Sequence, residues 1–183
     1  MRALLLVGAT LLLAGCASMR IDDFRGKEPP LVLQDYFDGH LTAYGIIKDR
    51  GGKVTSTFRA AFEAHWDENG IGTLNEDFLY DDGTRQKRSW TFRPTGENNF
   101  IGTAADIVGE SPIIVVGNTM RMDYTIRVPY KGDTLELRVR DWLHLQPDGV
   151  ILNHSYMRKF GFRVGELVIT IIKDFPETGP ENK

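Results

Sequence analysis

The segment from Val54 to Trp66 alternates apolar and polar side chains over about thirteen residues. Its apolar face carries Phe58, Phe62 and Trp66, and its other face carries Glu63. A period of two is the pattern of a strand with one buried face, and this strand would be about twice the usual length. Strands this long favour a closed barrel over a small sandwich.

Turn-forming residues divide the rest of the chain into further segments of this kind. The turns DRGG, DENG, YDDG, PTGENN, YKGD and QPDG are rich in Gly, Asp, Asn and Pro. The strands expected between them are Leu41–Lys48, Val54–Trp66, Ile71–Tyr80, Thr84–Arg93, Phe100–Val108, Asn118–Val128, Thr134–Leu145, Val150–Arg158 and Glu166–Lys173. The sequence therefore predicts an all-β fold, an antiparallel meander of eight to nine strands that closes into a lipocalin-like barrel.

The N-terminus carries the signal for a lipid anchor. Arg2 and the apolar run Ala3–Leu13 are too short to cross a bilayer but fit a signal peptide. The run ends in Leu-Ala-Gly-Cys, which resembles the bacterial lipobox, and Cys16 is the only cysteine in the chain. We expect cleavage before Cys16 and attachment of a thioether-linked diacylglycerol to its thiol, with palmitate among the acyl chains. Ala17, where Asp would favour inner-membrane retention, predicts the periplasmic face of the outer membrane of a Gram-negative bacterium.

The expected organisation follows from these boundaries. Residues 1–15 would be the lipoprotein signal peptide, 16–30 the acylated cysteine and a polar tether, 31–175 the barrel and 176–183 a polar tail. Within the third segment, Leu31–Gly39 groups Leu, Tyr and Phe as a short plug or turn against the core. The formal net charge is only −3, with no basic stripe, so we expect no nucleic-acid partner.

Polar residues recur on the apolar faces of the expected strands, namely Glu76, Arg88, Asp106, Asn118 and Asp141. Buried charges must be paired or hydrogen-bonded. One interpretation is the polar end of a pocket, where Arg88 binds a carboxylate or phosphate group. The other is a set of ion pairs, of Arg88 with Glu76 or Asp106, that fixes the register of the strands.

Aromatic and methionine side chains would surround that polar end. The candidates for an apolar lining are Phe58, Phe62, Trp66, Phe78, Trp90, Met120, Met122 and Tyr124. Such residues suit an acyl chain. They would fill a solid core equally well, so the sequence leaves open whether the barrel holds a cavity.

No motif for catalysis or metal binding appears. His40, His65, His144 and His154 lack metal-ligand spacing, and no serine stands in a G-x-S-x-G setting. We therefore predict no metal, no cofactor and no enzymatic activity. The alternative is a lipid-modifying enzyme in which Asp106 or Asp141 acts as a base.

The blocks FDGHLTAYGIIKDRGG, LNEDFLYDDGTRQKRSW, GTAADIVGE, GNTMRMDY, RDWLHL and NHSYMRKFGFRVGE resemble a proteobacterial lipoprotein family, domain-of-unknown-function family 3833. The resemblance covers about Leu31 to Lys173. It implies a lipobox, a lipocalin-like β domain and no assigned activity. We expect a barrel that binds a lipid, fatty acid or other hydrophobic molecule. The alternative is an envelope interaction or assembly module, with a filled barrel and a protein partner.

Overall fold

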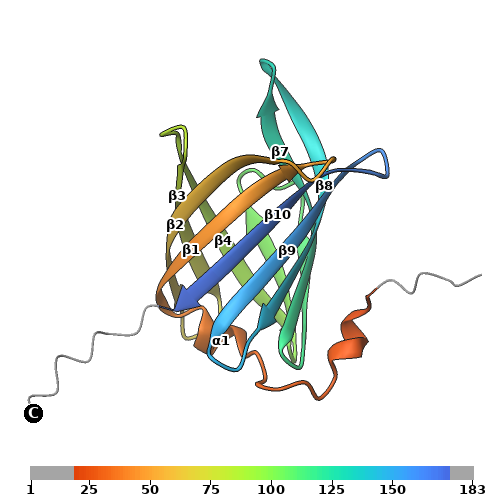
Figure 1. The fold of residues 1–183 in the computed structure, drawn as a ribbon. Coiled ribbons are helices and arrows are strands. Elements are labelled where there is room, and N and C mark those ends of the chain that lie inside the picture. Colours follow the sequence, from red (N-terminus) through yellow and green to blue (C-terminus); the bar gives the residue numbers. More distant parts are fainter. Residues whose placement is uncertain (1–18, 174–183) are drawn as a thin grey trace, which may run out of the picture.

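Ten antiparallel strands among residues 19–173, the part of the chain that the structure describes, close into a barrel in this computed structural model (Figure 1). The strands are β1 (Gly39–Asp49), β2 (Val54–Trp66), β3 (Gly72–Tyr80), β4 (Arg85–Gly96), β5 (Asn99–Ala104), β6 (Ser111–Val116), β7 (Thr119–Tyr130), β8 (Asp133–Leu145), β9 (Val150–Lys159) and β10 (Phe162–Lys173). Each strand pairs with the next along the chain, and β10 pairs with β1 to close the barrel. The predicted all-β closed meander is confirmed.

The strand count differs from the prediction at one place. The expected strand Phe100–Val108 ends earlier, as β5, and the chain then forms the additional strand β6. β6 has only six residues and contains Pro112, and a proline inside a short run argues against a central strand. Between the two strands, Asp106 and Val108 exchange backbone hydrogen bonds with β7.

A short helix closes one end of the barrel. α1 (Leu33–Tyr36) buries the side chains of Leu33 and Tyr36, and Leu31 and Phe37 on either side of it are also buried. The Tyr36 hydroxyl donates a hydrogen bond to the carbonyl oxygen of Ile171 in β10, at 3.0 Å. The predicted plug is therefore confirmed.

The preceding segment lies on the outside of the barrel. The 3-10 helix η1 (Ile21–Phe24) places the ring of Phe24 at 5.0 Å from His144 and 6.0 Å from Trp142. Gly117 packs so tightly beneath it that an added side chain would overlap the Phe24 carbonyl oxygen. Residues 19–30 of the predicted tether thus include contacts with the barrel, whereas Cys16, the signal peptide and the 176–183 tail lie outside the described residues. No helix within 19–173 is long and apolar enough to cross a bilayer.

Gly45 in β1 leaves room for an aromatic ring. It lies directly opposite Phe58 of β2, and a Cβ atom at Gly45 would overlap that ring. We expect Gly45→Ala to lower the free energy of unfolding by about 1–3 kcal/mol, since a packed core resists added atoms. Urea unfolding would measure it, with Gly51→Ala in the exposed β1–β2 turn as the control. Equal stability of the two variants would contradict close packing at Gly45.

Candidate functional site

A cavity of about 200 Å³ lies inside the barrel. One water molecule needs only about 10–15 Å³ of such space, so the cavity is large enough for a small organic molecule. Leu33 and Phe37 line it at the α1 end, and Met157 and Leu167 line it where the strands run toward the opposite end. The barrel is therefore not filled.

Most residues predicted for the apolar lining do line this cavity. They are Phe58, Phe62, Phe78, Trp90, Met120, Met122 and Tyr124. Trp66 is not among the lining residues. It ends β2 beside the plug, where its indole N–H donates to the carbonyl oxygen of Phe37 at 2.6 Å and its ring stacks on Phe92.

Asn118 is likewise outside the cavity. The alternating pattern extends to this residue, but β7 begins at Thr119, and Asn118 lies in the preceding turn. Its side-chain amide donates a hydrogen bond to the carbonyl oxygen of Leu145 at 3.0 Å. Its polar group therefore joins the β6–β7 turn to the end of β8 rather than facing a ligand.

Arg88 forms the centre of a charged cluster at the cavity wall. Its Nε and Nη2 donate to Oδ2 of Asp106 at 2.9 and 2.8 Å, and its Nη1 lies 3.5 Å from Oε2 of Glu76. Glu76 and Arg88 are direct neighbours on β3 and β4. Both line the cavity, whereas Asp106 lies behind Arg88, in the loop after β5. The sequence left two interpretations open. The structure shows the ion pairs of one interpretation, and it places Arg88 and Glu76 in the wall of a pocket, as in the other.

Asp141 of β8 is held by a second set of contacts. The hydroxyl of Tyr124 in β7 donates to its Oδ2 at 3.1 Å, and the amide of Asn153 in β9 donates to its Oδ1 at 2.8 Å. The hydroxyl of Ser155 also donates to Oδ1. All four residues line the cavity. The sequence analysis did not single out Ser155 as a site residue, although Asn153 and Ser155 share the inward face of β9 with Ile151 and Met157.

Burial changes the pKa values of two side chains in this cavity wall. Burial raises the pKa of Glu76 to about 7; the nearby Arg88 opposes the shift, and the charges of Asp141 and Asp106 add to it. Burial, followed by the charge of Asp141, also raises the pKa of Tyr124 well above its usual value. Oε2 of Glu76 and Oδ1 of Asp106 are buried without a hydrogen-bond partner. Glu76 thus has a raised pKa and an oxygen, Oε2, that faces Arg88 at 3.5 Å but accepts no hydrogen bond.

The histidines do not form a site. Nδ1 of His144 lies 2.9 Å from the hydroxyl of Thr119, and burial, followed by the charge of His154, lowers its pKa. Nε2 of His154 lies 3.6 Å from Glu166 on the outer face. No group of three or more His, Cys, Asp or Glu residues within 19–173 is arranged to hold a metal ion.

The barrel is similar to a solved structure with a very different sequence. It matches the S-type phycobiliprotein lyase CPES from Guillardia theta with a TM-score of 0.58 and 7% sequence identity, over 79% of this chain and 92% of that chain. At this identity the likeness shows the fold alone. No curated protein matches the chain.

The likeness corrects one prediction. We predicted that the chain is not an enzyme because the sequence shows no catalytic motif. A barrel of the same fold belongs to a protein named a lyase, and this finding contradicts the prediction. The lack of a linear motif does not exclude catalysis in this fold, because strands can bring together residues that are far apart in the sequence.

The family resemblance noted from the sequence blocks is confirmed. Residues 10–173 match the family described as "Protein of unknown function (DUF3833)". The match covers the last residues of the predicted signal peptide, Cys16, the plug and all ten strands. The chain belongs to the DUF3833 family.

Proposed function

We propose that the barrel binds a small, largely apolar molecule, a lipid or another hydrophobic compound, with its polar group against Glu76 and Arg88. The observation that carries this proposal is an apolar cavity of about 200 Å³ with an ionisable cluster in its wall. Ligand sites in proteins typically combine an apolar lining with a few convergent polar groups. The cavity argues against the alternative of a filled barrel.

The pairing of Arg88 indicates which polar group fits best. Three nitrogens of its guanidinium already face Asp106 and Glu76, so little of its charge is free for an anion. Glu76, which lines the cavity, retains a buried oxygen without a hydrogen bond, and buried acceptors favour a donor. A hydroxyl, an amide or a protonated carboxylic acid therefore suits this wall better than a carboxylate does, and a fatty acid would bind in its protonated form.

Glu76 supports a second candidate function, proton transfer to the bound molecule. A carboxyl group with a pKa near 7 is suited to act as acid or base, and Asp141 beside it is held by three hydrogen-bond donors. Two carboxyl groups in such different environments recur in enzymes that need both an acid and a base. An extracted ligand that is chemically changed by the wild-type protein but not by Glu76→Gln would support this function.

We also propose that Cys16 is acylated and holds the barrel at the periplasmic face of the outer membrane. The support is the Leu-Ala-Gly-Cys sequence and the Ala17 that follows it. Labelled palmitate should be incorporated by the wild-type chain and not by Cys16→Ser. Recovery of the labelled protein in the inner-membrane fraction would contradict the location.

Native mass spectrometry of gently purified Cys16→Ser protein tests the binding function. We expect an added mass, which solvent extraction would identify. In the same background, Val139→Phe places a ring in the cavity, since Val139 is 5% exposed and lines it. This variant should lose the added mass while keeping its melting temperature to within a few degrees, because the ring enters empty space.

Val168→Phe is the matched control. Val168 is 37% exposed on the outside of β10, so the same substitution there should leave the added mass in place. An apo mass for the wild-type protein, with no uptake from envelope lipid extracts, would contradict the binding function.

A further inference from the structure

The β9–β10 hairpin presents the two most exposed large apolar side chains of the described residues. Phe160 is 87% exposed and Phe162 is 77% exposed. The hairpin projects beyond the barrel at the end opposite α1 (Figure 1). Neither ring contributes to the core. These rings can therefore be buried only by contact with a molecule outside the described fold.

The backbone conformation at position 160 is unfavourable for phenylalanine, so folding stability does not explain why a phenylalanine stands there. Its φ is +50°, followed by +84° at Gly161, and this left-handed conformation favours Gly or Asn over a bulky side chain. The ring has Lys159 at 5.0 Å from its centroid. The β7–β8 hairpin also pairs a lysine with an exposed aromatic ring, but there the lysine has the left-handed backbone: Lys131 has a φ of +51° and lies 5.2 Å from the ring of Tyr130, which is 52% exposed.

Two arginines below the hairpin have no ion-pair partner among the described residues. Arg138 of β8 and Arg158 of β9 lie directly opposite each other, both exposed on the outer face. Like charges in this position are destabilising. Both line a surface groove together with Lys159 and Phe160. A ligand with negative charge would relieve their repulsion.

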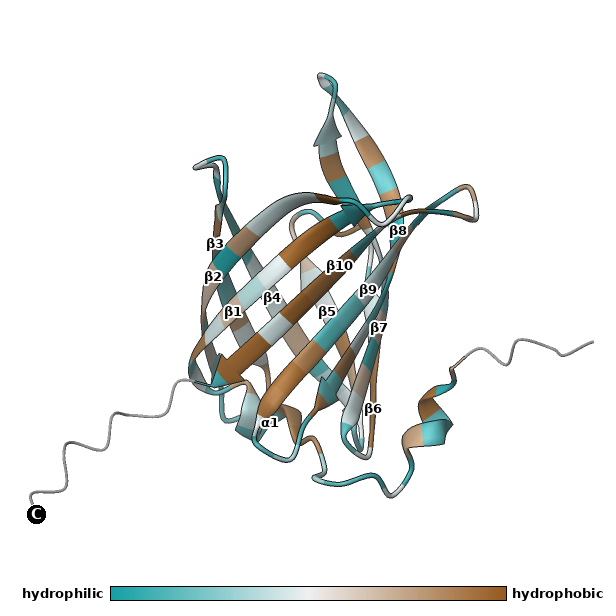
Figure 2. Ribbon diagram, viewed as in Figure 1, coloured by the Kyte–Doolittle hydropathy of each residue, from teal (hydrophilic) through white to brown (hydrophobic). Residues whose placement is uncertain are grey.

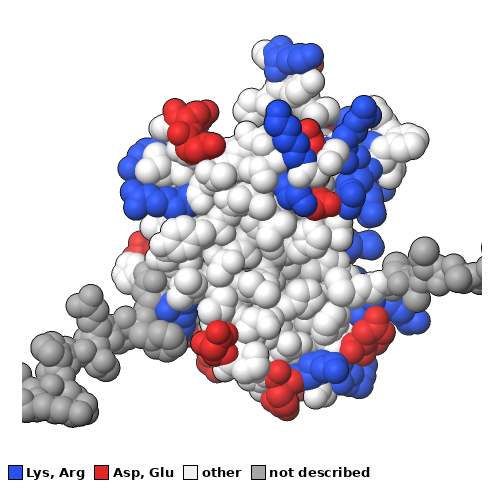
Figure 3. Space-filling view, viewed as in Figure 1, with Lys and Arg blue, Asp and Glu red and all other residues white. Residues whose placement is uncertain are grey.

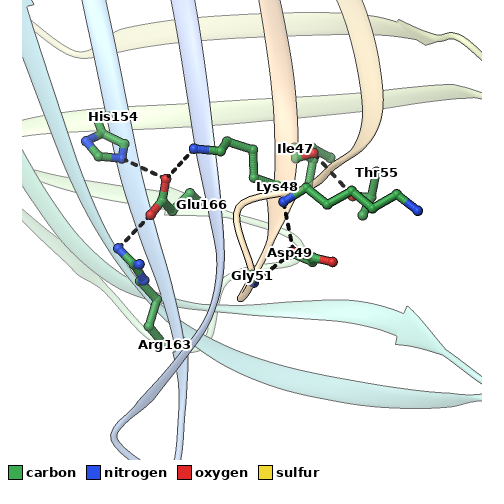
Figure 4. Close-up of polar contacts among 9 residues, drawn as sticks. Ile47, Lys48, Asp49, Gly51, Thr55, His154, Arg163 and Glu166 are labelled. Carbon is green, nitrogen blue, oxygen red and sulfur yellow. Dashed lines mark hydrogen bonds and ion pairs between the residues drawn. The ribbon is translucent and has the colours of Figure 1, made fainter.

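Three other basic side chains near the hairpin converge on one carboxylate. Figure 4 shows Arg163, Lys48 and His154 pointing at Glu166 of β10, with ion-pair distances of 2.6, 3.2 and 3.6 Å. Although burial raises the pKa of Glu166, the hydrogen bond from Lys48 and the charges of Arg163 and Lys48 lower it below its usual value. Arg138 and Arg158, by contrast, carry positive charge on the outer face that no carboxylate of the described residues neutralises.

The end of the barrel that carries the projecting hairpins differs from the side of the barrel in its density of charged side chains. Lys and Arg gather over the projecting hairpins, with Asp and Glu among them, whereas the middle of the same face, over β1, β10 and β9, carries no charge (Figure 3). Apolar residues continue along β10 and β1 on this side (Figure 2). Met157 and Leu167, which line the cavity, lie on the same two strands as the hairpin tip.

We propose that the β9–β10 hairpin docks on the surface of an anionic phospholipid bilayer. Phe160 and Phe162 enter the interfacial region, and Arg138 and Arg158 meet the lipid phosphates. Aromatic side chains flanked by basic ones are suited to this boundary, and guanidinium groups bind phosphate through paired hydrogen bonds. Docking would direct the end of the barrel opposite α1 toward the bilayer. The inference does not depend on what the cavity holds.

A fluorescent label at the tip tests the proposal. Cys16→Ser removes the only cysteine, and Phe162→Cys then carries an environment-sensitive dye such as NBD. With vesicles of phosphatidylethanolamine and phosphatidylglycerol (3:1), we expect a blue shift and at least a twofold rise in emission. Vesicles of phosphatidylcholine alone should give a much smaller change. The readout is local to residue 162, so attachment of the chain elsewhere does not mimic it.

Leu152→Cys, labelled in the same way, is the matched control. Leu152 is an apolar residue of β9, 48% exposed, on the outer face near the opposite end of the strand. Its emission should not change. A response at residue 152 without one at 162 would show docking through the side of the barrel and overturn the proposal, as would no response at either residue. An equal response at 162 to both vesicle types would overturn the role of the arginines.

Phe160→Asn separates docking from folding. Asn adopts the left-handed conformation more readily, so the melting temperature should stay the same or rise. The response of the label at residue 162 should fall at least threefold. An undiminished response would overturn the role of Phe160. Arg138→Gln with Arg158→Gln should remove the preference for anionic vesicles, and an unchanged preference would overturn their role.

Discussion

Arg88→Met is expected to lower the free energy of unfolding by about 3–5 kcal/mol at pH 7.5, because removing one partner of a buried ion pair leaves its carboxylates uncompensated. Arg88 is the cation that contacts both Glu76 and Asp106, and its side chain is only 14% exposed. Methionine keeps much of the volume between the rings of Phe78 and Trp90, which lie about 6.0 Å from the guanidinium. The loss should shrink as the pH falls, because protonation removes the unpaired charges.

Urea unfolding would measure this effect, with Lys87→Met as the control. Lys87 is the next residue on β4, and its side chain is 79% exposed and pairs with Asp77 on the surface, so its loss should cost less than about 1 kcal/mol. Neutralising the whole cluster, with Glu76→Gln and Asp106→Asn added to Arg88→Met, should recover part of the stability. If Arg88→Met cost no more than Lys87→Met, the cluster would not be stabilised by its ion pairs.

Glu76→Gln is expected to make the protein more stable than the wild type at pH 8, by roughly 3 kcal/mol. The pKa of Glu76 is raised from 4.5 to about 7 in the folded state, so the folded protein binds this proton more tightly than the unfolded chain does. Wild-type stability from this group is therefore fully present below pH 4.5 and is lost as the pH rises through 7. Glutamine stays neutral, so its advantage should grow between pH 4.5 and 8 and disappear below that range.

Unfolding in urea at pH 5, 6, 7 and 8 would follow this difference. Glu63→Gln, on the exposed face of β2, is the control and should shift stability by less than about 0.5 kcal/mol at every pH. A stability difference for Glu76→Gln that is the same at pH 5 and pH 8 would contradict the raised pKa. A ligand that donates a hydrogen bond to Glu76 should also bind more weakly to the wild type as the pH falls through 7.

The period-two pattern was sufficient to predict which side chains face inward along a strand. Glu76, Arg88 and Asp141 line the cavity as the alternation of their strands predicts. The pattern fails at strand ends. There the alternation of apolar and polar residues continues beyond the strand, whereas the cavity does not extend that far. Trp66, Asp106 and Asn118 are the residues that this affects.

Other features depend on information that a single strand does not carry. The contact between Arg88 and Asp106 needs the loop after β5 to lie against β7. The opposition of Arg138 and Arg158 depends on the register between two strands, and alternation within each strand leaves that register open. Whether the core is filled depends on how the shapes of many side chains fit together, so the sequence could not distinguish a cavity from a solid core.

The pairing of β1 with β10 has a consequence for how the protein is made. Leu41 lies opposite Lys173, so the seam of the barrel joins the first strand to the last. The plug also depends on the last strand, through the hydrogen bond from Tyr36 to Ile171. Contacts this distant in sequence form slowly, and during synthesis the seam must wait for the final strand. A molecule bound to the nine-stranded intermediate would then be enclosed as the barrel closes around it.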